Sequence, residues 1–207
     1  MKIGIDYSIT SPSLSIEKDN KLYFISFFDT KGKNYTTSIQ YKYYNELKNI
    51  ITVIPYTTTI DKTTYQSEQV SKMKSASDIS HLICSIIDRL FGTETCKIAI
   101  EGFSYSSFSS SSLDLCMYQS FLRLDLVRKY GADNIVIVSP SQVKKNLSGN
   151  GKSSKEEMIE AFKSNKLNDD ILVDTLFWKY INNTELDYKH IKPIDDICDS
   201  YSVLRCI

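Results

Sequence analysis

Residues 2–6 and 97–101 of this 207-residue chain have the sequences KIGID and KIAIE, two short apolar stretches that each end on an acid. Both predict buried strands, because short Ile-rich runs are typical of strands covered on both faces. Between them, apolar residues recur with the 3.6-residue period of a helix over 77–91. Strands linked by such a crossover are usually parallel neighbours. We therefore expect Asp6 and Glu101 to lie side by side at the carboxyl edge of one sheet, where open sheets bind ligands.

The other segments place these two strands in a mixed sheet. SLSIEK and KLYFISFF, separated by Asp19 and Asn20, predict a hairpin directly after the first strand. NIVIVS predicts a fifth strand, and helical patterns are expected at 112–130, 140–147, 154–164, 169–182 and after Pro193. The expected fold is α/β, with a mixed five-stranded sheet of three antiparallel strands followed by parallel strands, and helices on both faces. The run IITVIPY is left open as a further strand or the core of an insertion.

Length and composition predict one globular domain over residues 1–207, with an insertion at 31–75 and an extended helical segment at 165–193. Twenty-five basic and 25 acidic residues cancel, so a nucleic acid would have to be held by local patches. The five cysteines form no CxxC pair, which indicates free thiols in a reducing compartment. No apolar run reaches the ~18 residues of a membrane span. The expected location is the cytoplasm.

A second group of acids stands in IDDICDSYSVL, residues 194–204. Asp196 and Asp199 are three apart and share a helix face, and Asp195 lies one turn from Asp199, so it replaces Asp196 if the helix register differs. Acids at a helix start often only complement the helix dipole. These are embedded among apolar residues, which favours a ligand role. Together with Asp6 and Glu101 they predict an all-oxygen site suited to Mg²⁺ or Mn²⁺.

Two hard cations between carboxylates typically serve in-line attack of water on a phosphodiester. The two histidines, His81 in a helix and His190 in a polar loop, are not expected to be catalytic. The segment VSPSQVKKNLSGNGKSSKEEMIEAF, residues 138–162, places Lys144 and Lys155 eleven residues apart around a Gly-rich turn whose amides can cradle a phosphate. The ordinary alternative is a turn with surface lysines.

Two nucleotide-binding interpretations are disfavoured. GKS at 151–153 matches the end of a P-loop, but Asn146 stands where its first glycine belongs, and seven residues separate the preceding strand from the loop. GIDYSIT looks like the first phosphate loop of the actin and sugar-kinase ATPases, but the second loop and the longer chain of those proteins are missing.

Four segments, in this order, resemble the signatures of RuvC-type Holliday junction resolvases: GIDYS, IAIEGFS, SPSQVKKNLSGNGKSSKEEM and DDICDSYSVL. The resemblance implies an RNase H-like fold, a homodimer and Mg²⁺-dependent nicking of branched DNA by paired active sites, with Mn²⁺ able to substitute. It implies four metal ligands that are also catalytic, Asp6, Glu101, Asp196 and Asp199. Lys155, also catalytic, and Lys144 would lie near the scissile phosphate. The insertions at 31–75 and 165–193 resemble elaborated phage or viral members, whose location would be the host cytoplasm.

Further DNA contacts are expected from Lys145 and Lys152. An aromatic residue that opens the junction normally follows the second acid of the family, and here Phe103, Tyr105 and Phe108 compete for that role. The leading hypothesis is a structure-selective DNA endonuclease acting on four-way junctions. The alternatives are an RNase H-like nuclease acting on flaps, forks or RNA·DNA hybrids, and a non-catalytic DNA-binding descendant of the fold.

Overall fold

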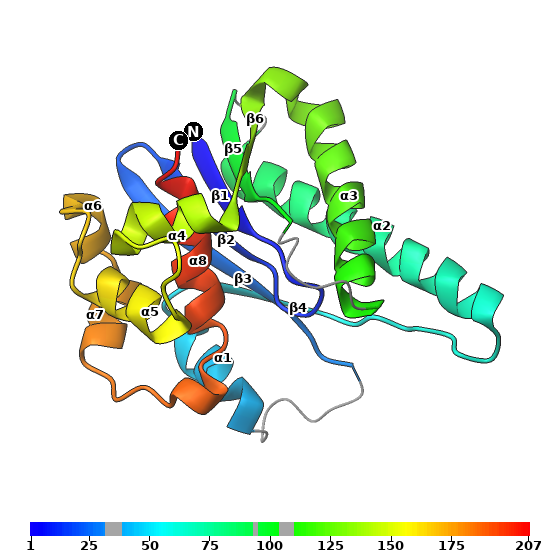
Figure 1. Cartoon of the computed structure of the whole chain (residues 1–207), viewed down its shortest axis with the longest axis horizontal. Helices are drawn as coiled ribbons and strands as arrows, with labels where there is room; N and C mark the ends of the chain where they lie inside the picture. Colours follow the sequence, from blue (N-terminus) through cyan, green and yellow to red (C-terminus); the bar gives the residue numbers. More distant parts are fainter. Residues whose placement is uncertain (32–38, 93–94, 104–109) are drawn as a thin grey trace.

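The structure, a computed structural model, describes residues 1–31, 39–92, 95–103 and 110–207 (Figure 1). These residues form a six-stranded sheet in the order β4-β3-β2-β1-β5-β6. The antiparallel pairs β1–β2 and β2–β3 make the predicted meander, and β5 and β6 follow in parallel on the other side of β1. The strand bounds are β1 Lys2–Asp6, β2 Ser13–Lys18, β3 Lys21–Asp29, β4 Thr52–Tyr56, β5 Lys97–Glu101 and β6 Ile135–Val138.

The predicted count of five strands was wrong, because IITVIPY contributes a sixth. Its residues 52–56 form β4, which pairs in parallel with β3 at the edge of the sheet. The strand contains Pro55, which has no backbone N–H to donate and is therefore tolerated mainly in edge strands. Proline weakens the strand signal in the sequence, and only the pairing with β3 decides the assignment.

Eight α-helices are found among the described residues: α1 Lys42–Leu47, α2 Tyr65–Phe91, α3 Ser110–Tyr130, α4 Pro140–Ser148, α5 Lys155–Lys163, α6 Asp170–Val173, α7 Leu176–Asn182 and α8 Ile194–Leu204. Two differ from expectation. Helix α2 begins twelve residues before position 77, since Thr64 and Ser67 form a capping box ahead of polar turns. The pattern over 169–182 is two helices, because the hydroxyl of Thr175 accepts a hydrogen bond from Trp178 and starts a new one.

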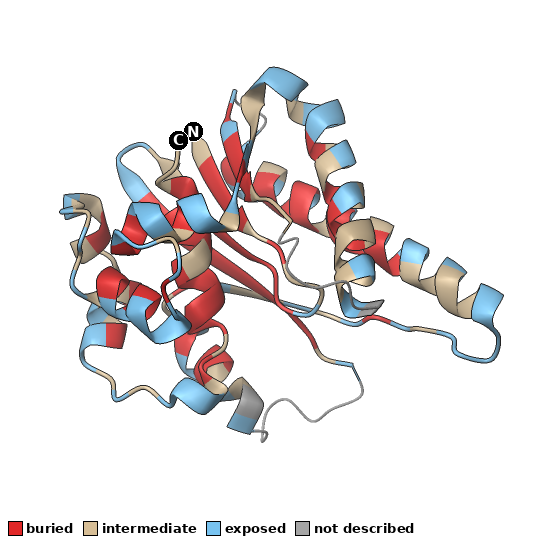
Figure 2. Cartoon of the chain, in the orientation of Figure 1, coloured by how far each residue is buried: buried red, intermediate tan, exposed pale blue. Residues whose placement is uncertain are grey.

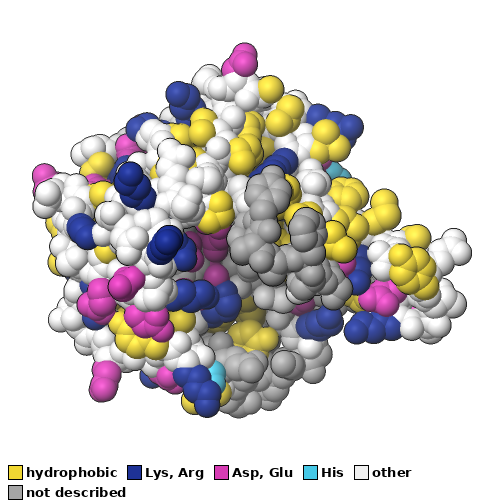
Figure 3. Space-filling model, viewed as in Figure 1, with side chains coloured by type: hydrophobic (Ala, Val, Ile, Leu, Met, Phe, Trp, Pro, Cys, Tyr) yellow, Lys and Arg dark blue, Asp and Glu magenta, His cyan; other side chains and the backbone are white. Residues whose placement is uncertain are grey.

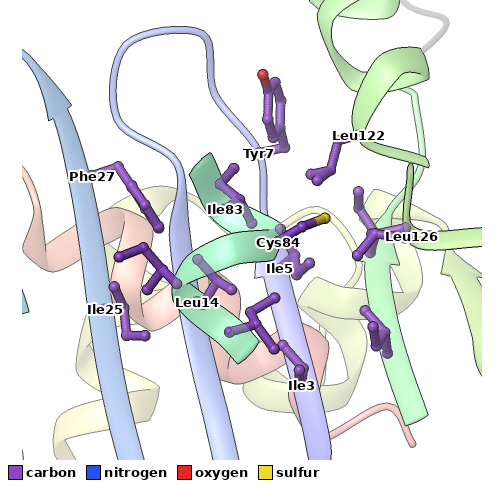
Figure 4. Packing of buried hydrophobic residues seen from close by; sticks show 14 of the residues in the cluster. Ile3, Ile5, Tyr7, Leu14, Ile25, Phe27, Ile83, Cys84, Leu122 and Leu126 are labelled. Carbon is purple, nitrogen blue, oxygen red and sulfur yellow. The ribbon is translucent and has the colours of Figure 1, made fainter. Parts of the chain in front are cut away.

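One face of the sheet packs on α2 and α3 (Figure 1). Ile3 and Ile5 of β1 are fully buried there with Ile83 of α2 and Leu122 of α3 (Figure 4). Each buried side chain of this size contributes about 1.5–3 kcal/mol relative to exposure. Because successive side chains of a strand point to opposite faces, this packing turns Gly4 and Asp6 toward the other face.

Helix α8 lies against that other face, and small side chains allow its close approach. A Cβ atom on Gly4 would overlap the backbone of Ser200 and Leu204. The hydroxyls of Ser15 in β2 and Ser200 are hydrogen-bonded at 2.8 Å. Ala99 of β5 packs beside Val203. Figure 2 shows α8 as the most continuously buried helix of this layer, with more exposed helices outside it.

Candidate active site

The first two predicted acids, Asp6 and Glu101, stand at the ends of adjacent strands. Strands β1 and β5 pair in parallel, as predicted, with Ile5 opposite Ile100. The next residue of each strand is the acid, so Asp6 and Glu101 occupy equivalent heights at the carboxyl edge of the sheet. Asp6 is on the side of Gly4, and therefore faces α8.

The first turns of α8 bring three more acids to this edge. Asp196, Ser200 and Leu204 are four residues apart and share the helix face that rests on Gly4. The side chains of Asp195 and Asp196 are buried, with residue exposures of 3% and 4%. Asp199 lies one turn further along. We call Asp6, Glu101, Asp195, Asp196 and Asp199 the acidic cluster.

Burial and mutual repulsion hold several of these acids toward their protonated forms. Burial raises the pKa of Asp6 well above its ordinary value, and the charges of Asp199, Asp196 and Glu101 raise it further. Burial, followed by the charge of Glu101, raises the pKa of Asp199 to about 7. Burial also raises the pKa of Asp196 to about 6, although Lys192 opposes this rise. Asp6 thus interacts electrostatically with each of the other three predicted acids.

Two lysines partly neutralise the acidic cluster. The ammonium of Lys192 is paired with Asp196 and lies 3.8 Å from Asp195 Oδ2. Lys155, the first residue of α5, donates to Asp195 Oδ2 at 2.7 Å. Burial lowers the pKa of each lysine, but interactions with these aspartates outweigh it and raise both pKa values. Lys155 was predicted to lie near the site, whereas Lys192 was not.

A cavity of about 360 Å³ opens beside the cluster. We call it the acidic cleft; its walls include Glu101, Asp199, Lys144 and Lys155. Lys144 lowers the pKa of Glu101, which burial otherwise raises, and its ammonium donates to the Ser153 carbonyl oxygen at 2.8 Å. Figure 3 shows acidic side chains at the bottom of a hollow bordered by basic ones. The Gly149–Gly151 turn thus brings both predicted lysines to one cleft.

Helix α3 contacts Glu101 and Phe103. Gln119 and Arg123 donate to the Glu101 carbonyl oxygen at 2.8 and 3.1 Å. The Arg123 guanidinium also lies over the ring of Phe103, with 4.2 Å between its carbon and the ring centroid. Phe103 lines the acidic cleft. The other two aromatic candidates, Tyr105 and Phe108, lie outside the described residues.

The remaining predicted residues lie further out. Lys145 and Lys152 are exposed on α4 and in the turn that follows it. The His81 ring is exposed and lies 3.5 Å from Asp125 on the α2–α3 side of the sheet. His190 lies 3.0 Å from Asp187 Oδ2, in the segment just before α8. Neither histidine belongs to the acidic cluster.

The donor chemistry of the cluster fits a hard divalent cation. Buried Asp195 Oδ1 and Asp196 Oδ2 have no hydrogen-bond partner among the described residues, and buried carboxylate oxygens normally require one. In the described part of the chain, however, there is no group of three Asp, Glu, His or Cys side chains that lie close enough to share one ion. Lys192 lies among the acids and supplies the positive charge instead. A cation would therefore have to compete with an ammonium group.

Sequence reasoning missed Lys192 and Gln119. Lys192 lies in the turn before α8, outside the helix, so helical spacing does not predict that its ammonium meets Asp196. Nothing in the sequence marks Gln119, because its partner is a backbone carbonyl eighteen residues earlier.

Comparisons with known proteins bear on the fold. No protein-family model and no curated protein matches the chain. The yeast mitochondrial Holliday junction resolvase Ydc2 is similar in structure, with a TM-score of 0.52 and 16% identity over 99% of this chain and 75% of that one. Two structures of Thermus thermophilus RuvC, one of them in complex with Holliday junction substrate, each give a TM-score of 0.48 and 14% identity. Each comparison covers 98% of this chain, and the two cover 93% and 92% of the RuvC chains. The likeness to Ydc2 shows a common fold and confirms the predicted fold class.

None of the helices in the described part of the chain is long and apolar enough to cross a membrane.

Proposed function

We propose that this chain is a metal-dependent, structure-selective endonuclease that hydrolyses phosphodiester bonds in branched DNA, with the four-way junction as its substrate. It would act as a homodimer that nicks two strands in pairs, with Mg²⁺ as cofactor and Mn²⁺ as a substitute. A phage or viral origin, with action in the host cytoplasm, remains part of the proposal.

The observation that carries this proposal is the acidic cluster itself. Five acids from β1, β5 and α8 gather at one sheet edge, and burial and mutual repulsion raise the pKa values of Asp6, Asp196 and Asp199. Keeping charged groups in such a place costs free energy unless a cation or a substrate compensates them. A purely structural or non-catalytic role gives no reason for this arrangement. The shared fold with a junction resolvase supports the choice of substrate.

Each residue has a part in the proposed chemistry. Asp6, Glu101, Asp196 and Asp199 would hold the metal, with Asp195 as a further oxygen donor. The ions, when bound, would activate water and stabilise the leaving oxygen. Lys155 and Lys144, on opposite sides of the Gly-rich turn, would bind and orient the scissile phosphate in the acidic cleft. Phe103, held by Arg123 at the cleft wall, would contact the bases next to the branch.

The test is a cleavage assay on matched substrates. Wild-type protein with Mg²⁺ is compared on a four-way junction, a flap, a fork, a linear duplex and an RNA·DNA hybrid, beside Asp6→Asn. We expect symmetric paired nicks confined to the junction, and no cleavage by Asp6→Asn, which should retain the fold and DNA binding. Asp133→Asn, an exposed acid distant from the cluster in sequence, is the matched control and should cleave normally.

The other outcomes identify the alternatives. Equal cleavage of flaps, forks and junctions would indicate a general debranching nuclease, and preference for the hybrid an RNase H-like activity. Binding of branched DNA without cleavage in any divalent ion would indicate a non-catalytic binding protein and overturn the enzymatic proposal.

A further inference from the structure

A second, larger cavity of about 510 Å³ lies next to the acidic cluster. We call it the tyrosine pocket. Its lining includes Phe28, Tyr41, Tyr44, Tyr188, Lys189 and Asp195. Its volume falls in the usual range for sites that enclose a small ligand. The proposed hydrolysis uses Lys155 and Asp195 but leaves the rest of this pocket without a role.

The pocket belongs to the same sheet edge as the acidic cluster. Because β1 and β3 are both antiparallel to β2, they run in the same direction. Through Ser13 of β2, Ser26 of β3 stands level with Asp6, two strands or about 10 Å away. Phe28 and Asp29 follow at the end of β3, two and three residues beyond this level at the same edge of the sheet. Lys155 lines both cavities. A strand of DNA with a phosphate at the acidic cluster would pass the mouth of the tyrosine pocket.

The inner wall of the pocket is aromatic. The ring centroids of Phe28 and Tyr44 are 4.6 Å apart, and that of Tyr41 lies 5.7 Å from Phe28 and 6.0 Å from Tyr44. Phe28 and Tyr44 are buried, whereas Tyr41 is half-buried, and all three line the cavity. Tyr188, on the opposite segment, is 39% exposed. Aromatic walls of this kind bind nucleobases by stacking, with little dependence on base identity.

The rim of the pocket is basic. Of its four lysines, Lys155 is paired with Asp195 and Lys192 with Asp196. Lys31, Lys189 and Asp29 are the other charged residues of the lining, apart from His190. The carboxylate of Asp29 accepts hydrogen bonds from the backbone amides of Lys31 and Thr58, and therefore does not need a lysine as its partner. Lys189 is exposed at the rim. An aromatic wall with a lysine rim matches the base and the phosphate of one nucleotide.

We propose that the tyrosine pocket receives one unstacked nucleotide of the strand that is cleaved, with its base against Tyr41 and its phosphate at Lys189. This inference rests on the proposed function and adds a source of selectivity to it. A nucleotide at a branch point is already poorly stacked, so its insertion costs less there than in a continuous duplex. The pocket would thereby favour branched over linear DNA without reading the sequence.

The test is a double-mutant cycle between protein and DNA, with binding to a four-way junction measured in EDTA so that metal-dependent cleavage is absent. Abasic sites are introduced one at a time along the strands near the branch. At one position, the abasic site should weaken binding by wild-type protein by about 5- to 100-fold, the usual value of one base stacked on an aromatic ring. A mismatch at the same position should tighten binding, because it lowers the cost of unstacking.

The protein variants complete the cycle. Tyr41→Leu keeps an apolar side chain but removes the ring, and should bind intact and abasic junctions equally. Tyr41→Phe keeps the ring and should behave as wild type. Lys189→Ala, at an exposed position where folding is not at risk, should weaken binding of the intact junction several-fold and reduce its salt dependence. Lys97→Ala, an exposed lysine at the opposite end of β5, is the matched control and should change neither.

Two results would overturn the inference. The first is an abasic penalty that is the same for wild type and Tyr41→Leu at every position. The second combines two observations: no abasic site weakens binding, and the wild-type protein binds a free deoxynucleoside monophosphate saturably whereas Tyr41→Leu does not. This result would assign the pocket to a free nucleotide. Either result leaves the proposed nuclease intact if wild-type protein still cleaves the junction. Failure to bind any branched DNA would instead refute the proposed function.

Discussion

Replacement of Asp199 by Asn should stabilise the metal-free protein at alkaline pH. Burial and the charge of Glu101 raise the pKa of Asp199 to about 7, from an ordinary value of 3.8. The folded protein therefore binds this proton more tightly than the unfolded chain. The stabilisation from the protonated carboxyl is fully present below about pH 4 and is lost as the pH rises through 7.

The size of the effect follows from the shift. Each pKa unit corresponds to 1.36 kcal/mol, so three units give about 4 kcal/mol at pH 8. Asn is neutral at every pH and nearly the same size. Asp199→Asn should therefore match the wild type near pH 4 and exceed its free energy of unfolding by up to about 4 kcal/mol at pH 8. The raised pKa values of Asp6 and Asp196 act in the same direction in the wild type.

Urea unfolding in EDTA, followed by circular dichroism from pH 4 to pH 8, measures this difference. With a slope of about 2 kcal/mol per molar urea, the two midpoints should differ by about 2 M at pH 8. Addition of Mg²⁺ at pH 8 should stabilise the wild type and help Asp199→Asn less, because the variant lacks one ligand. Asp133→Asn, an exposed control, should follow the wild type. A wild-type stability that does not fall between pH 4 and pH 8, or a variant less stable than wild type at pH 8, would refute the reasoning.

Three other changes test the remaining parts of the site. Lys144→Ala and Lys155→Ala should each weaken junction binding and lower the slope of log affinity against log salt concentration by about one, whereas Lys97→Ala should change neither. Filter-binding titrations at several salt concentrations measure the slope. An unchanged slope would show that these lysines do not contact the phosphate. Gly4→Ala should lower the free energy of unfolding by about 3 kcal/mol, because the added Cβ would overlap the backbone of α8. If thermal denaturation shows that the free energy of unfolding falls by less than about 1 kcal/mol, this packing of α8 on Gly4 is contradicted. Lys192→Met should tighten Mg²⁺ binding to the DNA-free protein by about fivefold, or near 1 kcal/mol, because the ammonium no longer competes with the ion for Asp196. Titration calorimetry measures this affinity. Weaker binding by the variant would show that the lysine supports the metal site instead.

Much of the fold could be predicted from local patterns. The hairpin between β2 and β3 turns at Asp19 and Asn20, which both adopt positive φ, as residues of this type do in tight turns. The parallel pairing of β1 and β5 followed from two matched strands and one helix between them. The start of α2 and the sixth strand could not be predicted in the same way, because polar helix turns and a proline-containing edge strand carry weak periodic signals.

The sequence by itself determined which residues we propose for the chemistry: two acids at strand ends, three in the first turns of one helix, and two lysines around a Gly-rich turn. The tertiary structure alone decided how they meet. Helix α8 rests on Ala99 and on Gly4, which is almost 200 residues away in the sequence, and this close approach places Asp196 and Asp199 beside Asp6. It also decided that Lys192 lies among the acids and that Tyr41 and Tyr188 face one pocket. Such contacts depend on packing between distant segments, and no local pattern of residues encodes them.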